Sequence, residues 1–268
     1  MSQINRCFDI LELFFENPGG LSLSEISART DIPMATAHRI LSFIKNRGYV
    51  YQDAREIYYL SLLLPSMGAN YIGGTGFTEL LQPHLDRLAA LTGEHVRLSS
   101  VVDGQIIWVL RAVVSSHGLQ YRGGIDTRII PHTTASGKMW LASLNDEEAL
   151  RIVSNWNIEQ SRNYAGPKAV TSVKSLLADL KSIRKLGYSI IVEEAEVGVC
   201  AIAIGVYQNN APGHLLGTVS VAGPTARLDR NKLESLVPDI RETAQKVQET
   251  WSLWTSVNRE PIAMSSLA

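Results

Sequence analysis

The sequence contains few cysteines and no long apolar run. Only Cys7 and Cys200 occur in 268 residues, too far apart for a disulfide framework or a zinc cluster of known spacing. The longest nearly unbroken apolar run, 197–207, is about half of what a bilayer span requires. Acidic residues interrupt the apolar stretch near the first methionine, so we expect no secretory signal peptide. These absences favour a cytoplasmic protein that does not enter a membrane.

A strong charge of either sign is also absent. Lys and Arg number 25 against 26 Asp and Glu, which gives a formal net charge of −1. A histone-like polycation is excluded, although a local basic patch would suffice for binding nucleic acid. With 45% hydrophobic and 19% charged residues, the chain can build a sizeable core. Its length suits two compact domains or one large one.

Motifs of common enzyme and metal sites are missing. The tripeptide Ser136-Gly137-Lys138 is not a phosphate-binding loop, because His132 stands where the first glycine belongs and Met139 follows the lysine. The glycines at 73–76 lack the pattern of a dinucleotide-binding turn, and the glycines around Ser220 lack that of a hydrolase elbow. The six histidines show no paired metal spacing. We therefore expect no enzyme activity, no metal and no cofactor.

The first 60 residues predict three helices followed by a hairpin. Apolar residues in 4–15 recur at three- and four-residue spacing. Ser22 and Glu25 form a capping-box pattern for a second helix. Pro33 is expected at the first position of a third helix, which Gly48 ends. Two aromatic and β-branched segments then flank a polar turn, so the whole block predicts a winged helix-turn-helix.

The third expected helix carries the first functional prediction. Stepping 100° per residue separates an apolar face from a face of small and polar side chains. Such polar groups bond base edges and phosphates, and small Ala35 permits close approach to a groove wall. Residues 29–58 hold five basic and three acidic side chains, a local charge of +2, with Arg55 expected at the wing tip. The predicted DNA-binding residues are Ser22, Ala35, Thr36, His38, Arg39, Ser42 and Arg55.

A different interpretation of this block is a three-helix module that contacts proteins. Winged helices also serve that role, and the third helix has one arginine near its centre. Arg39 would then be a solvated surface charge. The chain as a whole would be a small-molecule-binding enzyme, or a scaffold, whose winged helix mediates protein contacts.

The rest of the chain predicts a linker at 61–76, an effector-binding and oligomerisation domain at 77–257, and a tail at 258–268. The dipeptide Asp103-Gly104 is a strong hairpin signal. A long final helix is expected over 233–254, where Pro238 would kink it. The other expected helices lie around 81–88 and near 135–143, 146–153 and 171–186. The expected strands are 95–102, 105–113, 188–192, 199–207 and 215–221, with 119–122 as a further candidate.

Four segments of this sequence resemble the IclR family of bacterial transcription regulators. They are RCFDILELFFENPGGLSLSEISARTDIPMATAHRILSFIKNRGYVYQD near the start, IPHTTASGKMWLAS at 130–143, RKLGYSIIVEEAEVGVCAIAIGVY at 184–207 and LLGTVSVAGPTARL at 215–228. The resemblance implies an α+β fold, with an N-terminal winged helix-turn-helix joined by a linker to a GAF/profilin-like domain with a central antiparallel sheet. It also implies double-stranded operator DNA and a small metabolite as ligands, and self-association as a dimer or a dimer of dimers.

The effector site is expected where the chain enters a helix near residue 135. Thr133 or Thr134 can cap this helix, whose free N–H groups favour an anion, and small residues follow. A tightly packed helix entry without a ligand is the alternative. In the resembled family the effector lies between this helix start and the sheet. The resemblance implies Ala135, Ser136, Ile191, Ala201, Ser220 and Ala222 as effector-binding residues, to which we add Cys200 and Trp108. Cys200 lies one position before the family's cysteine, so an orientation away from the pocket is its alternative.

The sequence departs from the family pattern at three positions. Ala201 stands where cysteine is common, Gly205 where proline is expected, and Ala222 where a second serine is frequent. The predicted pocket is therefore less polar than usual, which favours a larger or partly apolar acid over glyoxylate. We predict a small organic acid, carboxylic or aromatic, as the effector.

Other side chains offer contacts for such an acid. Arg111 and Arg122 could pair with a carboxylate, and Trp108 and Tyr121 could stack on an aromatic ring. Surface charge and sheet packing are the alternative roles of these four residues. The acidic residues of 193–196 are interpreted mainly as a solvated edge or a dimer contact.

Overall fold

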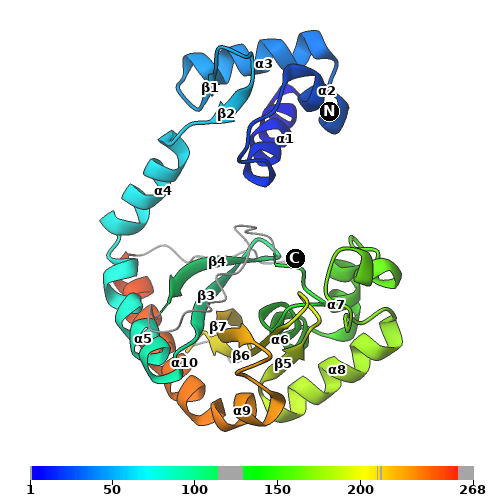
Figure 1. Cartoon of the computed structure of the whole chain (residues 1–268). Helices are drawn as coiled ribbons and strands as arrows, with labels where there is room; N and C mark the ends of the chain where they lie inside the picture. Colours follow the sequence, from blue (N-terminus) through cyan, green and yellow to red (C-terminus); the bar gives the residue numbers. More distant parts are fainter. Residues whose placement is uncertain (1, 114–128, 210, 212, 259–268) are drawn as a thin grey trace. The chain divides into compact units, whose positions relative to one another are not determined.

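The computed structural model describes residues 2–113, 129–209, 211 and 213–258. The chain divides into two compact units, Met1–Gly74 and Thr75–Ala268, each of which is described by itself (Figure 1). The predicted strand at 119–122, with Tyr121 and Arg122, lies outside the described residues, as does nearly all of the predicted tail. No helix in the described ranges is long and apolar enough to cross a membrane.

Three helices and a two-stranded hairpin build most of the N-terminal unit. The predicted capping box is present, because Ser22 Oγ accepts a hydrogen bond from Glu25 N–H while the Glu25 carboxylate accepts one from Ser22 N–H. Ile26, Leu41 and Tyr58 belong to one apolar core that joins the helices to the hairpin. The elements are α1 (Gln3–Glu16), α2 (Leu23–Thr30), α3 (Met34–Asn46), β1 (Val50–Gln52) and β2 (Tyr58–Leu60), the two strands pairing antiparallel. The winged helix-turn-helix expected from the sequence is confirmed.

One local prediction in this unit is wrong. Pro33 precedes α3 as its N-cap residue and is not the first helical residue, because its ψ of 135° is extended. The helix after the wing, α4 (Leu63–Gly74), lies within the segment predicted as the linker. It ends before Gly76, whose φ of 69° is left-handed and suits glycine.

A five-stranded antiparallel sheet forms the centre of the C-terminal unit. Its strands follow the order β4-β3-β7-β6-β5. The predicted hairpin joins β3 to β4, and Asp103 and Gly104 both have the positive φ of a type I′ turn. The bounds are β3 (His95–Val102), β4 (Gln105–Ala112), β5 (Ser189–Val192), β6 (Val199–Tyr207) and β7 (Leu215–Pro224). The α+β class and the central antiparallel sheet are confirmed.

Helices cover both faces of this sheet (Figure 1). On one face lie α5 (Phe77–Thr92) and α10 (Val237–Asn258), where the Phe77 ring contacts those of Trp251 and Trp254 edge to face. On the other face, Ala135, Leu180 and Ala201 belong to a core shared by helices and sheet. The helices of that face are α6 (Ala135–Ser143), α7 (Asp146–Val153) and α8 (Val173–Leu186), with a 3-10 helix at Ile158–Asn163.

The final helix is divided, contrary to the prediction of one kinked helix. A short α9 (Arg230–Ser235) ends before Leu236, and α10 begins at Val237. Pro238 has no backbone N–H to donate to a preceding turn, and it disfavours helical backbone in the residue before it. A proline is tolerated in the first turn of a helix, so a new helix starts here.

Candidate DNA interface and effector site

The exposed face of α3 is polar and basic. Ala35, His38 and Arg39 are exposed, while Thr36 and Ser42 are half-buried beside them. The opposite face is buried in the core and consists of Ala37, Ile40, Leu41 and Ile44. The 3.6-residue period of the helix thus separates the two sets. Of the seven proposed DNA-binding residues, Ser22 caps α2 and the other six lie on α3 or the wing.

Two exposed residues near the end of α3 extend this face and were not predicted. The Phe43 side chain is 60% exposed, and the guanidinium carbon of Arg47 lies 5.7 Å from the centre of its ring. Lys45 Nζ donates a hydrogen bond of 2.9 Å to Gln52 Oε1, which ties α3 to the wing. Stepping 100° per residue along α3 places Phe43 close to Arg39 on the helix surface, so the sequence could have indicated it.

The wing loop is organised around one carboxylate. Asp53 accepts hydrogen bonds from the N–H groups of Arg55 and Ile57 at 2.9 and 3.0 Å. These bonds, that from Ile57 above all, lower the pKa of Asp53. The Arg55 side chain is 81% exposed and forms an ion pair of 3.2 Å with Asp53. Arg55 therefore projects from a rigid loop, as an arginine that contacts DNA from a wing would.

Ser22, unlike the other proposed DNA-binding residues, lies at the N-terminus of α2. It is the N-cap of α2, and its hydroxyl donates a hydrogen bond of 2.7 Å to the Glu25 carboxylate. That bond is the leading cause of the lowered pKa of Glu25. The Ser22 hydroxyl is thus already hydrogen-bonded within α2. The N-terminus of a helix nevertheless commonly binds DNA phosphates.

In the C-terminal unit, hydroxyl groups link α6 to the sheet. Thr134 caps α6, its Oγ1 accepting a hydrogen bond of 3.1 Å from Gly137 N–H. In the first turn of the helix, Ser136 Oγ accepts a hydrogen bond of 2.8 Å from Thr218 Oγ1 of β7. Ser99 Oγ of β3 lies 2.8 Å from the same Thr218 hydroxyl. This buried chain identifies the sheet face that lies beneath the start of α6.

The strand register places most of the predicted effector residues on that face. Ala201 pairs with Ala222 on one side and with Ile191 on the other, and all three share a core with Ala135 of α6. Ser220 is two residues from Ala222 and has the same orientation, because strand side chains alternate with a period of two. These residues are all buried.

The inclusion of Cys200 in the effector site is wrong. Its thiol donates a hydrogen bond of 2.8 Å to the Leu228 carbonyl, on the face of the sheet opposite that of Ala201. Burial, the largest cause, raises the pKa of the Cys200 thiol to about 11. The period of two explains the error, because adjacent strand residues cannot face the same side.

Trp108 is accompanied by two polar residues that the sequence did not indicate. The guanidinium carbon of Arg97 lies 4.8 Å from the centre of a Trp108 ring, and Arg97 Nε donates a hydrogen bond of 3.4 Å to His95 Nε2. In the register, Arg97 stands opposite Ser220 on one side and Arg111 on the other. Alternation along 95–99 could have revealed that His95 and Arg97 share the face of Ser99.

A buried ion network lies close to this face. Lys138, nearly inaccessible, binds Asp179 at 2.6 Å and Glu194. Burial raises the pKa of Glu194, although the charge of Lys138 opposes this shift. The interpretation of Glu194 as part of a solvated edge is therefore wrong, while Glu196 is exposed.

A second buried cluster centres on His132. Its Nε2 lies 2.8 Å from Ser161 Oγ and 3.2 Å from the Tyr164 hydroxyl. Burial, followed by the charge of Lys138, lowers the pKa of His132 to about 4. The Ser161 hydroxyl also donates a hydrogen bond of 2.6 Å to the Ile158 carbonyl within the 3-10 helix, which joins that helix to this cluster. No group of metal-ligating side chains suited to an ion occurs among the described residues.

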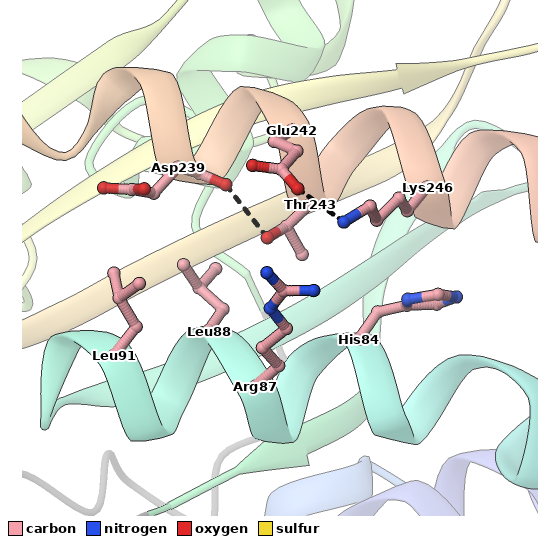
Figure 2. Close-up of a pocket in the computed structure, with 8 residues that line it drawn as sticks. All are labelled: His84, Arg87, Leu88, Leu91, Asp239, Glu242, Thr243 and Lys246. Carbon is pink, nitrogen blue, oxygen red and sulfur yellow. Dashed lines mark hydrogen bonds and ion pairs between the residues drawn. The ribbon is translucent and has the colours of Figure 1, made fainter.

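A groove of about 400 Å³, counting space open to solvent, lies between α5 and α10 on the opposite side of the sheet (Figure 2). Arg87 and His84 project from α5 towards Glu242 and Lys246 of α10, and the last two form an ion pair. The lining residues are His84, Arg87, Leu88, Leu91, Asp239, Glu242, Thr243 and Lys246. Acidic and basic groups are mixed there, so this groove does not select an anion.

Comparisons with known proteins agree with this arrangement. Residues 3–54 match the model of the IclR helix-turn-helix domain, and residues 69–249 match that of the bacterial transcriptional regulator IclR C-terminal domain. The HTH-type transcriptional repressor AllR of Escherichia coli strain K12 is 27% identical over 251 residues, 93% of this chain and 90% of that protein. AllR of Salmonella typhimurium is 26% identical over the same length.

Solved structures share the fold. An IclR transcriptional regulator from Alicyclobacillus acidocaldarius has a TM-score of 0.79 at 20% identity, covering 94% of this chain and 99% of that one. An IclR homologue from Microbacterium hydrocarbonoxydans, in complex with 4-hydroxybenzoate, has a TM-score of 0.72 at 20% identity, covering 93% and 98%.

Together these observations define a ligand-responsive, DNA-binding transcriptional regulator rather than an enzyme. The chain belongs to the IclR family of bacterial transcriptional regulators. Its helix-turn-helix domain binds DNA and its C-terminal domain binds a small-molecule effector.

Proposed function

We propose that this regulator binds a double-stranded operator through α3 and the wing, and that a small carboxylic or aromatic acid alters that binding. The exposed polar face of α3, centred on Arg39 and opposite a fully apolar face, is the observation that carries the DNA part. We assign DNA binding to residues 1–60 and effector binding and oligomerisation to residues 77–257, with 61–76 as the linker.

The proposed DNA contacts come from three places in the N-terminal unit. Arg39 and His38 reach base edges in the major groove, and small Ala35 lets the helix approach. Ser22 meets the phosphate backbone, and exposed Arg55 reaches the backbone or the minor groove. The full set is Ser22, Ala35, Thr36, His38, Arg39, Ser42 and Arg55.

The proposed effector site lies between the first turn of α6 and the sheet. The buried hydroxyl chain through Ser136 and the small alanines of β6 and β7 support it. Small side chains leave space for the body of a ligand, and the hydroxyls orient its polar end. The full set is Trp108, Ala135, Ser136, Ile191, Ala201, Ser220 and Ala222. The complex of the Microbacterium homologue with 4-hydroxybenzoate supports an acid of this class.

We also propose that the protein associates as a dimer or a dimer of dimers. On α1, Ile4, Phe8 and Phe15 are exposed at helical spacing, and on α4, Met67 and Tyr71 are exposed one turn apart. Exposed apolar stripes of this kind favour packing against another copy. Two copies would place two α3 helices on successive major-groove half-sites.

The effector would act by shifting a population of conformations. It would bind one arrangement of the C-terminal unit more tightly, and that arrangement would change how two α3 helices meet DNA. A coupling free energy of about 1–3 kcal/mol would change operator affinity by roughly 5–150-fold.

A bulky substitution at Ser136 tests the coupling directly. Ser136 is 1% exposed beneath the start of α6, so Ser136→Trp should fill the effector site. Operator affinity, measured by fluorescence anisotropy, should remain while the response to organic acids disappears. Ser182→Trp, an exposed position on α8, is the matched control and should respond like the wild type. A full response by Ser136→Trp would refute the proposed location of the site.

A further inference from the structure

We propose that Phe43 of α3 contacts the 5-methyl group of a thymine in the major groove of the operator, and so makes one position of the site specific for thymine. This inference rests on the proposed function, because it adds a base-reading residue to the same interface. Phe43 is not among the residues predicted from the sequence, and its role follows from its place on α3.

Phe43 lies on the same ridge of α3 as two of the proposed DNA contacts. Residues four apart in a helix are neighbours on its surface. The ridge therefore runs through Ala35, Arg39, Phe43 and Arg47, all of which are exposed. A helix rises about 1.5 Å per residue, so Phe43 lies about 6 Å further along α3 than Arg39. This distance is close to two base-pair steps of about 3.4 Å, so both residues can reach base edges of one half-site.

The Phe43 ring is an apolar group that stays in contact with water. Phe43 is 60% exposed, whereas the next residue, Ile44, is 2% exposed in the core. The core cluster of the N-terminal unit does not include Phe43 among its described members. An exposed apolar ring gains free energy when another apolar group displaces its water. In the major groove, the methyl group of thymine is the apolar group that a base edge presents.

Arg47 holds this ring in position. Its guanidinium carbon lies 5.7 Å from the centre of the Phe43 ring, within the range of a cation–π contact. A ring that is already oriented loses less entropy on binding. Arg47 is itself exposed where α3 ends, and its charge suits a phosphate beside the thymine. The pair therefore offers an apolar contact to a base and a positive charge to the backbone.

A contact with a second copy of the chain is the other use of an exposed phenylalanine. The exposed apolar residues of α1 form a row of their own, which consists of Ile4, Phe8 and Phe15. Phe43 instead has an arginine four residues away on either side. In a symmetric contact between two copies, these arginines would approach their own counterparts, and like charges repel. The negative charge of DNA attracts them, so charge favours DNA as the partner of Phe43.

Uracil substitution in a selected duplex tests the proposal. Selection of the full-length protein on a random duplex library defines the preferred site. Each thymine of that site is then replaced in turn by uracil, which pairs identically but lacks the methyl group. Fluorescence anisotropy should show at least one position where uracil weakens wild-type binding about 4-fold, the factor expected for burial of one methyl group. Phe43→Ala should bind the thymine duplex more weakly and lose this uracil penalty.

Two further variants make the result specific. Phe43→Leu keeps an apolar side chain at the position and should retain part of the uracil penalty. Phe15→Ala removes a phenylalanine of α1 that is 52% exposed, and it should retain the full penalty whatever its overall affinity. Because neither ring is buried, these substitutions create no cavity, and thermal unfolding confirms that each variant is folded.

Two results would overturn the proposal: a wild type that tolerates uracil at every thymine, or uracil penalties that Phe43→Ala leaves unchanged at every position. A lower oligomeric state of Phe43→Ala with unchanged penalties would assign the ring to an interface between copies. Both results leave operator binding in place. If the library yields no preferred duplex, the proposed function itself fails, and this inference fails with it.

Discussion

The Thr218 hydroxyl of β7 donates a hydrogen bond of 2.8 Å to Ser136 Oγ in the first turn of α6. Both side chains are buried, and the bond joins the central strands to the helix that covers the proposed effector site. A ligand that enters between them must accommodate or exchange this bond. The position of α6 on the sheet is therefore sensitive to what occupies the site.

Thr218→Val should lower the stability of the C-terminal unit. The substitution keeps the shape of the side chain but leaves the hydroxyls of Ser99 and Ser136 without a shared partner. The expected loss is about 1–3 kcal/mol of unfolding free energy. Denaturant unfolding measures it, with Thr171→Val, a half-buried threonine outside the sheet, as the control. Equal losses in the two variants would show that the hydroxyl chain contributes little.

Arg39→Ala should weaken operator binding and leave the fold intact. Arg39 is exposed on α3, so its removal creates no cavity and breaks no ion pair within the described residues. Loss of one specific base contact costs about 1–3 kcal/mol of binding free energy. Fluorescence anisotropy measures the affinity, and Arg151→Ala, an exposed arginine of α7, should bind like the wild type. Wild-type affinity in Arg39→Ala would remove this residue from the interface.

Lys138→Met should destabilise the protein in a pH-dependent way. Removing Lys138 leaves Glu194 and Asp179 without their cation, and breaking a buried pair costs about 3 kcal/mol or more. Burial already raises the pKa of Glu194 above its ordinary 4.5, so the folded state binds its proton more tightly than the unfolded state. The contribution of Glu194 to the free energy of unfolding therefore falls as the pH rises from 4.5 through its raised pKa.

Without Lys138, the pKa of Glu194 should rise further and the destabilisation should be smaller at pH 5 than at pH 7.5. Denaturant unfolding at the two pH values measures the difference. Lys181→Met, an exposed lysine of α8, is the matched control and should show little effect at either pH. A loss that is equal at pH 5 and pH 7.5 would contradict the role given to Glu194.

His132→Gln should flatten the acid side of the stability profile. Burial lowers the pKa of His132 from 6.5 to about 4, so the unfolded chain binds a proton that the folded protein does not. The stability from neutral His132 is present above pH 6.5 and is lost as the pH falls towards 4, by up to about 3 kcal/mol. Thermal unfolding from pH 4 to 7 compares the variant with the wild type. Parallel profiles would show that His132 does not titrate in this window.

Local sequence signals predicted much of the fold. The pair Ser22 and Glu25 marked the start of α2, and Asp103-Gly104 marked a hairpin, because both depend on residues a few positions apart. The division of the final helix at Leu236 was missed because the apolar period continues through α9 and α10. Only the missing backbone N–H and fixed φ of Pro238 indicate that a new helix starts there.

The candidate site was predictable only in part. The shared face of Ser220 and Ala222 followed from strand alternation, whereas Ala201 was implied by the family resemblance. Alternation also separates Cys200 from Ala201, and it should have excluded Cys200. The contacts of Arg97 and Lys138 could not be derived, because their partners Trp108 and Glu194 lie 11 and 56 positions away in the chain. Such contacts depend on strand register and on helix packing, which residue spacing alone does not fix.

The most direct measurement is fluorescence anisotropy of the full-length protein on tiled duplexes from the regions flanking its own gene. The titrations are made at two salt concentrations, with and without pooled organic acids. The account predicts tight binding to one tile, a steep loss of affinity at higher salt from phosphate contacts, and a change with a pool that contains carboxylic acids. Equal binding to every tile at both salt concentrations, unaltered by any pool, would contradict it.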